Sequence, residues 1–391
     1  MSRQGEVRRA ICQANLVVVK VGSSSLADPA GFLLPERLNA LVDALAKRYA
    51  TGRRMVLVSS GAQAAGMGPL GLTRRPRNLA EAQAAASVGQ GLLMARYTEA
   101  FAAHGIIAAQ VLLTSTDVIQ AAHYRNANRA LSTLLERGIV PIVNENDAVA
   151  TDEIRFGDND RLAALVAHLV HADALILLTD VDALYDAPPT RAGSRRIELV
   201  NGPGDLKGLT ISGRGSNVGT GGMVAKVQAA TLAASSGVPV LLTSAAQAEA
   251  VCDPARCDDP GLGTVFAATG RRISPKRLWL GYAAQTRGRL MVDAGAARAV
   301  VAGKSSLLAV GVVGVEGEFG PGEPVEVLDP TGRTIARGLA GYSSQDMRRI
   351  AGMSLHQIAQ TLGAERAVEA IHRDELVHHA RSRRPNQPPS A

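Results

Sequence analysis

The stretch Ile139–Arg161, which reads IVPIVNENDAVATDEIRFGDNDR, decides the fold. It begins as a short apolar run, the pattern of a buried strand, and becomes a loop dense in carboxylates and carboxamides. The helix-like run LAALVAHLV follows at 162–170. In an open α/β sheet, ligands bind where a strand gives way to a helix. A solvated connector is also rich in Asn and Asp, so this loop alone leaves a binding site and a solvated loop equally open.

The same order of strand and helix recurs through the first 270 residues. Apolar runs predict strands at 16–21, 55–58, 106–113, 139–143, 174–179 and 239–243. Helical periodicity or composition predicts helices at 35–49, 79–103 and 126–136, and the run at 219–226 opens a further helix that ends at Ser235. Apolar strands that alternate with helices are typical of an α/β fold, in which a mostly parallel sheet is sandwiched between helices.

The pattern changes after Pro260, where short alternating segments are separated by glycines. These segments lie at 290–292, 307–313, 324–328 and 334–338, and they predict a small β-rich domain. The expected organisation is a catalytic domain over 1–270, a linker over 271–286, the β-rich domain over 287–366, and a C-terminal extension with a disordered tail over 367–391.

The formal net charge of +7 is concentrated near the C-terminus. Residues 271–391 hold 17 Lys and Arg against 11 Asp and Glu, whereas residues 1–270 hold 25 against 24. This pattern is compatible with nucleic-acid contact, and equally with an arginine-preferring composition, since six of the 42 basic residues are lysines. No run reaches the roughly 18 apolar residues of a membrane span. The N-terminal apolar run ends in Lys20 and a glycine-serine turn, which predicts a first strand and not a signal peptide. We expect a cytoplasmic protein with no membrane partner.

Cysteine usage points to a reducing compartment. The three cysteines, Cys12, Cys252 and Cys257, are odd in number and form no CxxC pair. We therefore expect reduced thiols, with Cys252 and Cys257 incidental rather than metal-binding.

Four glycine-rich or small turns follow predicted strands, at 22–25, 59–62, 179–180 and 219–222. Such turns let backbone N–H groups approach phosphate oxygens, although each alone is weak evidence. The chain has neither GxxxxGK[ST] nor GxGxxG, which disfavours P-loop and dinucleotide enzymes. Lys20 and Lys226 lie beside two of these turns, and with Asp160 between them they would suit phosphoryl transfer. For a lysine in isolation, a surface charge is the more common role.

Six segments carry a resemblance to a known family. In chain order they are VVVKVGSSSL, VSSGAQAAG, QAAASVGQ, VPIVNENDAVATDEIRFGDND, LLTDVDALY and GTGGMVAK. Their order and spacing resemble those of the bacterial glutamate 5-kinase family within the amino acid kinase superfamily. The segments VDAGAARAVVAGKSSLLAVGV and ARGLAGYSSQDMRRIAG look like the PUA domain appended to that family.

The resemblance implies transfer of the γ-phosphate of ATP to the γ-carboxylate of L-glutamate, which gives L-glutamyl 5-phosphate, in the first step of proline biosynthesis. By this resemblance the catalytic residues are Lys20, Lys226 and Asp160: the two lysines contact the phosphate, and Asp160 orients them. The residues that hold glutamate are Ser60, Asp147 and Asn159. The implied ATP site comprises Lys20, Thr179, Asp180, Thr220, Gly221, Gly222, Met223, Val224, Ala225 and Lys226.

The resemblance also implies cofactors and partners. Magnesium would arrive with ATP and be held mainly by phosphates and water, without direct protein ligands. Ser115, Asp117, Asp182 and Asp186 are interpreted as loop and capping residues. Proline is the expected inhibitor, a dimer or tetramer the expected assembly, and glutamyl phosphate reductase a candidate recipient of the product.

The chain departs from the family pattern at two positions, and two rival functions explain parts of the sequence. Ala183 stands where the family usually has glycine, and Gln63 where it often has an aliphatic residue. One rival is another amino acid kinase, acting on acetylglutamate, aspartate or a nucleotide monophosphate, which the NENDAVAT–GDND pair and the PUA-like region disfavour. The other is an RNA-binding protein that uses the basic C-terminal domain, which would leave the lysines and Asp160 without a role.

Overall fold

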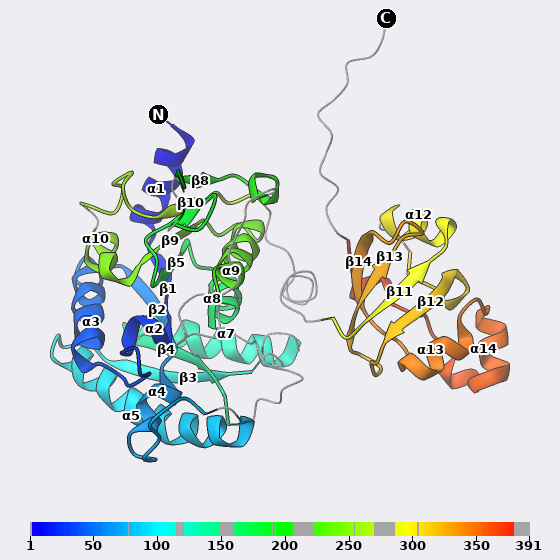
Figure 1. Ribbon diagram of the computed structural model, residues 1–391, viewed down its shortest axis with the longest axis horizontal. Helices are drawn as coiled ribbons and strands as arrows, with labels where there is room; N and C mark the ends of the chain where they lie inside the picture. Colours follow the sequence, from blue (N-terminus) through cyan, green and yellow to red (C-terminus); the bar gives the residue numbers. More distant parts are fainter. Residues whose placement is uncertain are drawn as a thin grey trace, which may run out of the picture. The chain divides into compact units, whose positions relative to one another are not determined.

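The computed structural model describes residues 2–76, 78–114, 117, 121–148, 159–189, 191, 193–206, 222–253, 255–269, 286–302 and 305–378. The chain forms two compact units, Met1–Pro275 and Lys276–Ala391 (Figure 1). Each has its own sheet and its own hydrophobic core.

The first unit is built on an eight-stranded sheet. In spatial order its strands are β3 (Ala108–Leu113), β4 (Val140–Glu145), β2 (Arg54–Ser59), β1 (Leu16–Val21), β5 (Ala174–Thr179), β9 (Val240–Ser244), β10 (Thr264–Phe266) and β8 (Leu199–Val200). All neighbouring pairs are parallel except β9 and β10. A separate short ribbon pairs β6 (Leu184–Tyr185) with β7 (Arg196–Ile197). The predicted mostly parallel sheet is confirmed.

Helices cover both faces of this sheet (Figure 1). One face is covered by α3 (Pro35–Tyr49), α5 (Leu79–Ala102) and α10 (Ala248–Cys252). The other face is covered by α7 (Ala121–Glu136), α8 (Asn159–Leu169) and α9 (Met223–Ser235). The predicted sandwich of helix, sheet and helix is therefore present.

The central strand β1 divides its side chains between the two faces. All six of its residues are buried, because β2 and β5 flank it and helices cover it above and below. Val17, Val19 and Val21 belong to the core shared with α3 and α5. Since side chains alternate along a strand, Lys20 points to the opposite face, the one covered by α8 and α9.

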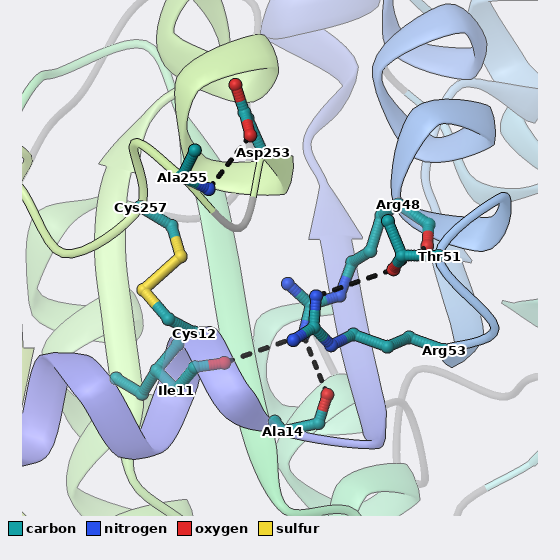
Figure 2. The surroundings of a disulfide bond; sticks show 9 residues. All are labelled: Ile11, Cys12, Ala14, Arg48, Thr51, Arg53, Asp253, Ala255 and Cys257. Atoms are coloured by element: carbon teal, nitrogen blue, oxygen red, sulfur yellow. Dashed lines mark hydrogen bonds between the residues drawn. A yellow bond between two sulfur atoms is a disulfide. The ribbon is translucent and has the colours of Figure 1, made fainter.

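A helix that the sequence did not predict, α1 (Arg3–Gln13), precedes β1. Two buried arginines hold it: Arg8 Nη2 donates to Gly263 O at 3.1 Å, and Arg48 Nη2 donates to Ala14 O at 2.9 Å. Figure 2 shows Arg48 beside the end of α1. The helix belongs to the packed first unit despite its polar composition.

The expectation of three reduced thiols is wrong. Cys12 of α1 forms a disulfide with Cys257 (Figure 2), and the two Cα atoms lie 5.7 Å apart. Their sequence separation is 245, so no local spacing could reveal the pairing. Cys252 is free and buried.

The second unit is a small sheet with helices, as expected for a β-rich domain. Its strand order is β12 (Val312–Gly317), β11 (Gly288–Val292), β13 (Pro324–Leu328), β14 (Thr334–Leu339) and β15 (Leu376–His378). The helices are α12 (Ala294–Ala302), α13 (Ser344–Ile350) and α14 (Leu355–Leu362).

Two details of the second unit differ from the sequence reading. The strand expected from residue 307 starts only at Val312, because Ala309–Gly311 forms a 3₁₀ turn. Ile371 and Leu376 lie in the core of the unit, and β15 pairs with β14. The packed part of the unit therefore continues past residue 366, into the segment expected as an extension.

Candidate active site

A buried triad of charged side chains joins three elements of the first unit. Lys20 Nζ of β1 lies 2.5 Å from Asp160 Oδ1, and Lys226 Nζ of α9 lies 3.5 Å from Asp160 Oδ2. The three side chains are 5%, 10% and 1% exposed for Lys20, Lys226 and Asp160. Each carboxylate oxygen thus faces one ammonium group, and the structure brings together the three residues expected to be catalytic.

Local sequence explains how these groups meet. Asp160 is the second residue of α8, where the helix dipole favours an anion. Lys226 lies one turn into α9, which begins after Gly222. Gly22 directly follows β1, and a Cβ added there would lie 3.4 Å from Lys20 Nζ. The turn after β1 therefore passes directly beside the buried ammonium group.

The expected nucleotide residues lie at the same ends of the strands. Gly222 caps α9, and Met223, Val224 and Ala225 form its first turn. Thr179 ends β5 and donates to Asp180 Oδ1 at 2.8 Å. Thr220 and Gly221 lie outside the described residues.

A cavity of about 530 Å³ opens beside the ends of β1, β5 and β9. Thr179 and Asp180 line it, together with Ser24, Ser244 and Glu249. Its position at the carboxyl edge of a parallel sheet is where α/β proteins bind their ligands. It brings the two expected nucleotide residues of β5 next to the small-residue turn after β1.

The expected glutamate residues Ser60 and Asn159 are in direct contact. Asn159 Nδ2 donates to Ser60 Oγ at 2.9 Å, to Ser59 O at 3.3 Å and to Asn144 Oδ1 at 2.9 Å. Ser60 precedes Gly61, whose φ of 115° is in the region that favours glycine. This left-handed residue turns the chain sharply from β2 into the next helix, α4 (Ala62–Met67), and leaves Ser60 at the strand end.

Asp147, the third expected glutamate residue, lies in the turn after β4. It is partly buried and stands two residues beyond Glu145, the last residue of that strand. Asn146 N donates to Leu113 O at 2.9 Å, which anchors the start of the turn on the neighbouring strand β3. Asp147 therefore starts from the same sheet edge as Asn159 and Ser60.

The site contains buried polar residues to which the sequence reading gave no role. Asn144 is 3% exposed and donates from Nδ2 to Gln90 Oε1 of α5 at 2.8 Å. Tyr97 of the same helix is hydrogen-bonded to Ser59 Oγ at 2.8 Å, and burial raises the pKa of its phenol. Gln90 and Tyr97 are seven residues apart, two helical turns, so that spacing could have indicated one shared face.

The residues interpreted as capping groups make local hydrogen bonds. Asp117 Oδ2 accepts from Thr114 N and Thr114 Oγ1, both at 2.7 Å. Asp182 accepts from Tyr185 Oη at 3.0 Å, and Asp186 accepts from Arg195 N at 2.8 Å. Ser115 lies outside the described residues.

Of the two departures from the family pattern, one lies in the bend before β6 and the other in α4. Ala183 is 1% exposed and directly precedes β6. Gln63 lies in the first turn of α4. Within the described part of the chain, neither residue forms a hydrogen bond or ion pair with the charged triad.

The described ranges contain no group of three or more His, Cys, Asp or Glu side chains with the geometry to hold a metal ion. Within those ranges, no helix has the length and apolar character needed to cross a membrane.

Chemically, the triad is suited to stabilising negative charge. The triad places two ammonium groups beside one carboxylate, and all three side chains are nearly closed to water. Preorganised charges of this kind act most strongly where charge develops in a transition state, and phosphoryl transfer depends mainly on such positioning.

Comparison with known proteins identifies the family of the chain. The model of the amino acid kinase family matches residues 15–244, and that of the PUA domain matches residues 288–362. The curated glutamate 5-kinase of Streptomyces coelicolor is 56% identical over 371 residues, covering 95% of this chain and 98% of that protein. The glutamate 5-kinase of Thermobifida fusca is 56% identical over 375 residues, covering 95% of each. The chain therefore belongs to the amino acid kinase family, as a kinase that carries a C-terminal PUA domain.

Proposed function

We propose that this kinase transfers the γ-phosphoryl group of ATP to the γ-carboxylate of L-glutamate and so makes L-glutamyl 5-phosphate. The observation that carries the proposal is the buried contact of Lys20 and Lys226 with opposite oxygens of Asp160. Its substrate assignment is supported by the relatives at 56% identity, which are named glutamate 5-kinases.

The reaction needs charge and orientation more than a protein nucleophile. The glutamate γ-carboxylate is ionised at neutral pH, so it can attack phosphorus without a general base. As the bond to the leaving phosphate oxygen breaks, negative charge spreads over the transferring group. Lys20 and Lys226 would stabilise that charge, while Asp160 keeps both ammonium groups aligned.

The substrate would lie beside Ser60 and Asn159, whose side chains are already joined by a hydrogen bond of 2.9 Å. Asp147 would receive the glutamate ammonium group, because a carboxylate forms the stronger, charge-assisted hydrogen bond with a cation. The nucleotide would lie at Thr179, Asp180 and the turn that precedes α9.

Magnesium would enter with the nucleotide. The Asp160 carboxylate faces two lysines, which leaves it poorly suited to hold a cation. Phosphate oxygens and water therefore supply most of the expected coordination, as is usual for Mg²⁺ bound with a nucleotide. The ion would neutralise the phosphate charge that the two lysines leave uncompensated.

The test is an ATP-consumption assay with glutamate, N-acetylglutamate or aspartate as acceptor, in which hydroxylamine traps the acyl phosphate as a hydroxamate. Glutamate should be the substrate that supports turnover and hydroxamate formation. Turnover with acetylglutamate or aspartate instead would identify a different kinase of the family. Full kinase activity after deletion of residues 285–391, together with RNA binding by the full chain, would show that the PUA domain has a function of its own.

Feedback inhibition by proline belongs to the same proposal. Proline shares the α-carboxylate and a cationic nitrogen with glutamate but lacks the γ-carboxylate, so it could fill the Ser60, Asp147 and Asn159 site without offering a nucleophile. Inhibition should then be competitive with glutamate. Measuring it at several glutamate concentrations, in the full chain and in a 1–284 truncation, tests the idea. A truncation that keeps full activity but is not inhibited by proline would contradict it.

The proposal also covers the oligomeric state, the cellular compartment, the fate of the product and the domain limits. We expect a homo-oligomer, a cytoplasmic reaction, and release of the product to a reductase that accepts glutamyl phosphate. The expected domain limits, 1–270, 271–286, 287–366 and 367–391, are working boundaries for truncations. The core position of Ile371 and Leu376 argues for keeping the second unit at least to His378.

A further inference from the structure

Three carboxamide side chains form a hydrogen-bonded series that ends at the expected glutamate site. Gln90 of α5 accepts from Asn144 Nδ2 at 2.8 Å, and Asn144 Oδ1 accepts from Asn159 Nδ2 at 2.9 Å. Asn144 is 3% exposed, so water is a poor substitute for either partner. The orientation of each carboxamide therefore depends on its neighbour.

Backbone groups beside Asn144 and Asn159 set the direction of the series. Glu145 N, which can only donate, is 2.9 Å from Asn144 Oδ1. Ser59 O, which can only accept, is 3.3 Å from Asn159 Nδ2. These contacts require the oxygen of Asn144 and the nitrogen of Asn159 to face each other, and they turn Asn144 Nδ2 toward α5. Position 90 must therefore provide an acceptor.

The same arrangement fixes the free end of Asn159. The two hydrogens of Asn159 Nδ2 are shared among three acceptors, Ser59 O, Ser60 Oγ and Asn144 Oδ1, so the oxygen of this carboxamide is directed away from those acceptors. Asn159 Oδ1 is buried and has no hydrogen-bond partner within the described ranges. A buried acceptor without a donor is costly, and the substrate ammonium group is a donor that could satisfy it.

The neighbouring glycine explains how Gln90 comes so close to the sheet edge. A Cβ added at Gly89 would lie 1.8 Å from Ala62 O and 2.4 Å from Gly66 N. Only glycine allows α5 to cross α4 at this distance. The dipeptide Gly89–Gln90, which closes the QAAASVGQ motif, thus combines close helix packing with an acceptor for Asn144.

We infer that Gln90 is a positioning residue for the acceptor substrate, acting through Asn144 on Asn159. Its carboxamide oxygen holds Asn144 in the orientation that turns Asn159 Oδ1 toward the substrate's donor. The inference rests on the proposed function, since it assumes an amino acid acceptor beside Asn159. It assigns a role to QAAASVGQ, the one of the six motifs quoted above that holds none of the residues expected to bind phosphate, nucleotide or glutamate.

The test compares two substitutions in the full chain. Gln90→Met has similar length but no acceptor oxygen, whereas Gln90→Glu keeps one and serves as the matched control. Gln90→Met should raise the KM for glutamate about tenfold, because Asn144 Nδ2 loses its partner. The kcat and the KM for ATP should change less than about threefold, and Gln90→Glu should restore most of the glutamate affinity.

A coupling measurement separates positioning from general destabilisation. With Asn144→Ala already present, adding Gln90→Met should change the glutamate KM little, since the series is already broken. Additive losses, an unchanged KM in Gln90→Met, or equal losses in kcat and both KM values would overturn the inference. If the methionine variant does not fold, Gln90→Ala gives the same comparison.

Direct binding distinguishes this inference from the proposed function. Glutamate should raise the thermal unfolding temperature of the wild-type protein, and the shift should be smaller in Gln90→Met. Wild-type protein that neither binds nor phosphorylates glutamate would refute the proposed function. Wild-type activity with an equal glutamate-induced shift in Gln90→Met would refute only the role of Gln90.

Discussion

Lys20 Nζ lies 2.5 Å from Asp160 Oδ1, and both side chains are almost completely shielded from solvent. Removing one partner of a buried ion pair leaves an uncompensated charge, which costs far more than the loss of a surface contact. Because Lys226 faces the other oxygen of the same carboxylate, a change at Asp160 affects two cations. The triad therefore links the stability of the first unit to its chemistry.

Asp160→Asn should lower kcat by about 100-fold or more, because both lysines lose their orienting anion. It should also lower the free energy of unfolding by about 3 kcal/mol. Steady-state kinetics and urea denaturation measure the two effects. Asp147→Asn is the matched control and should mainly raise the KM for glutamate. An exchange of the two kinetic phenotypes would overturn the assignment.

Lys226→Ala should lower kcat by about 100-fold or more while changing the KM for glutamate much less. The reason is that an ammonium group in contact with the transferring phosphoryl group stabilises the transition state more than the bound substrates. Initial rates at saturating ATP and varied glutamate measure both constants. Lys47→Ala, at an exposed ion pair with Glu249, serves as the control and should leave both constants near wild type. Wild-type turnover in Lys226→Ala would contradict the role.

Asp117→Asn should lower the free energy of unfolding by about 1 kcal/mol at pH 7, because a neutral amide caps Thr114 less well. Burial alone would raise the pKa of Asp117, but hydrogen bonds from Thr114 and the contact with His123 outweigh it and lower that pKa. A lowered pKa in the folded state contributes stability above the unfolded value of about 3.9, which is lost as the pH falls further. Urea titrations of both proteins at pH 7 and pH 3 should show the difference shrinking in acid, and a constant difference would contradict this cause.

Thiol labelling should report the pairing of the three cysteines. Burial raises the pKa of Cys252 to about 11, so this thiol is protonated and shielded at pH 8. Iodoacetamide should label no cysteine in the folded protein, one after unfolding without reductant, and all three after unfolding with reductant. Intact-mass measurement counts the labels. Three labels without reductant would show that Cys12 and Cys257 are not joined.

Cys12→Ser should lower the free energy of unfolding by up to about 5 kcal/mol, because the disulfide restrains a very long loop in the unfolded chain. Denaturation with and without reductant should show the wild-type protein falling to the level of the variant. Cys252→Ser is the control, and its response to reductant should remain that of the wild type. A Cys12→Ser variant as stable as the wild type would contradict the prediction.

The bounds of strands and helices were predicted best from the sequence where burial is continuous or strictly periodic. The strands at 16–21 and 174–179 and the helix at 35–49 have the predicted bounds, since uniform apolar runs and a clear helical face set them. The helix α1 was missed because four of its eleven residues are charged, and contacts made by Arg8 and Arg48 hold it in place. Such contacts leave no periodic signal in the sequence.

The candidate site was predictable in part for the same reason. Lys20, Asp160 and Lys226 stand at strand and helix ends, which can be placed from sequence, and the structure brings them together. Gln90 and Tyr97 of α5 act through side-chain hydrogen bonds to Asn144 of β4 and Ser59 of β2, and these depend on how closely the helix packs against the sheet. The paired cysteines are likewise close only in the folded chain.

The bond between Cys12 and Cys257 also makes most of the first unit a covalent ring. Every candidate site residue, from Lys20 to Lys226, lies on this ring. The second unit, Lys276–Ala391, lies outside the ring and is joined to it only at its N-terminal end along the chain. One peptide-bond cut between residues 12 and 257 would leave both fragments attached until the disulfide is reduced. A cut after Cys257 and before Gly288 would break the covalent link between the ring and the PUA domain, whereas a cut inside the ring keeps the catalytic parts in one molecule.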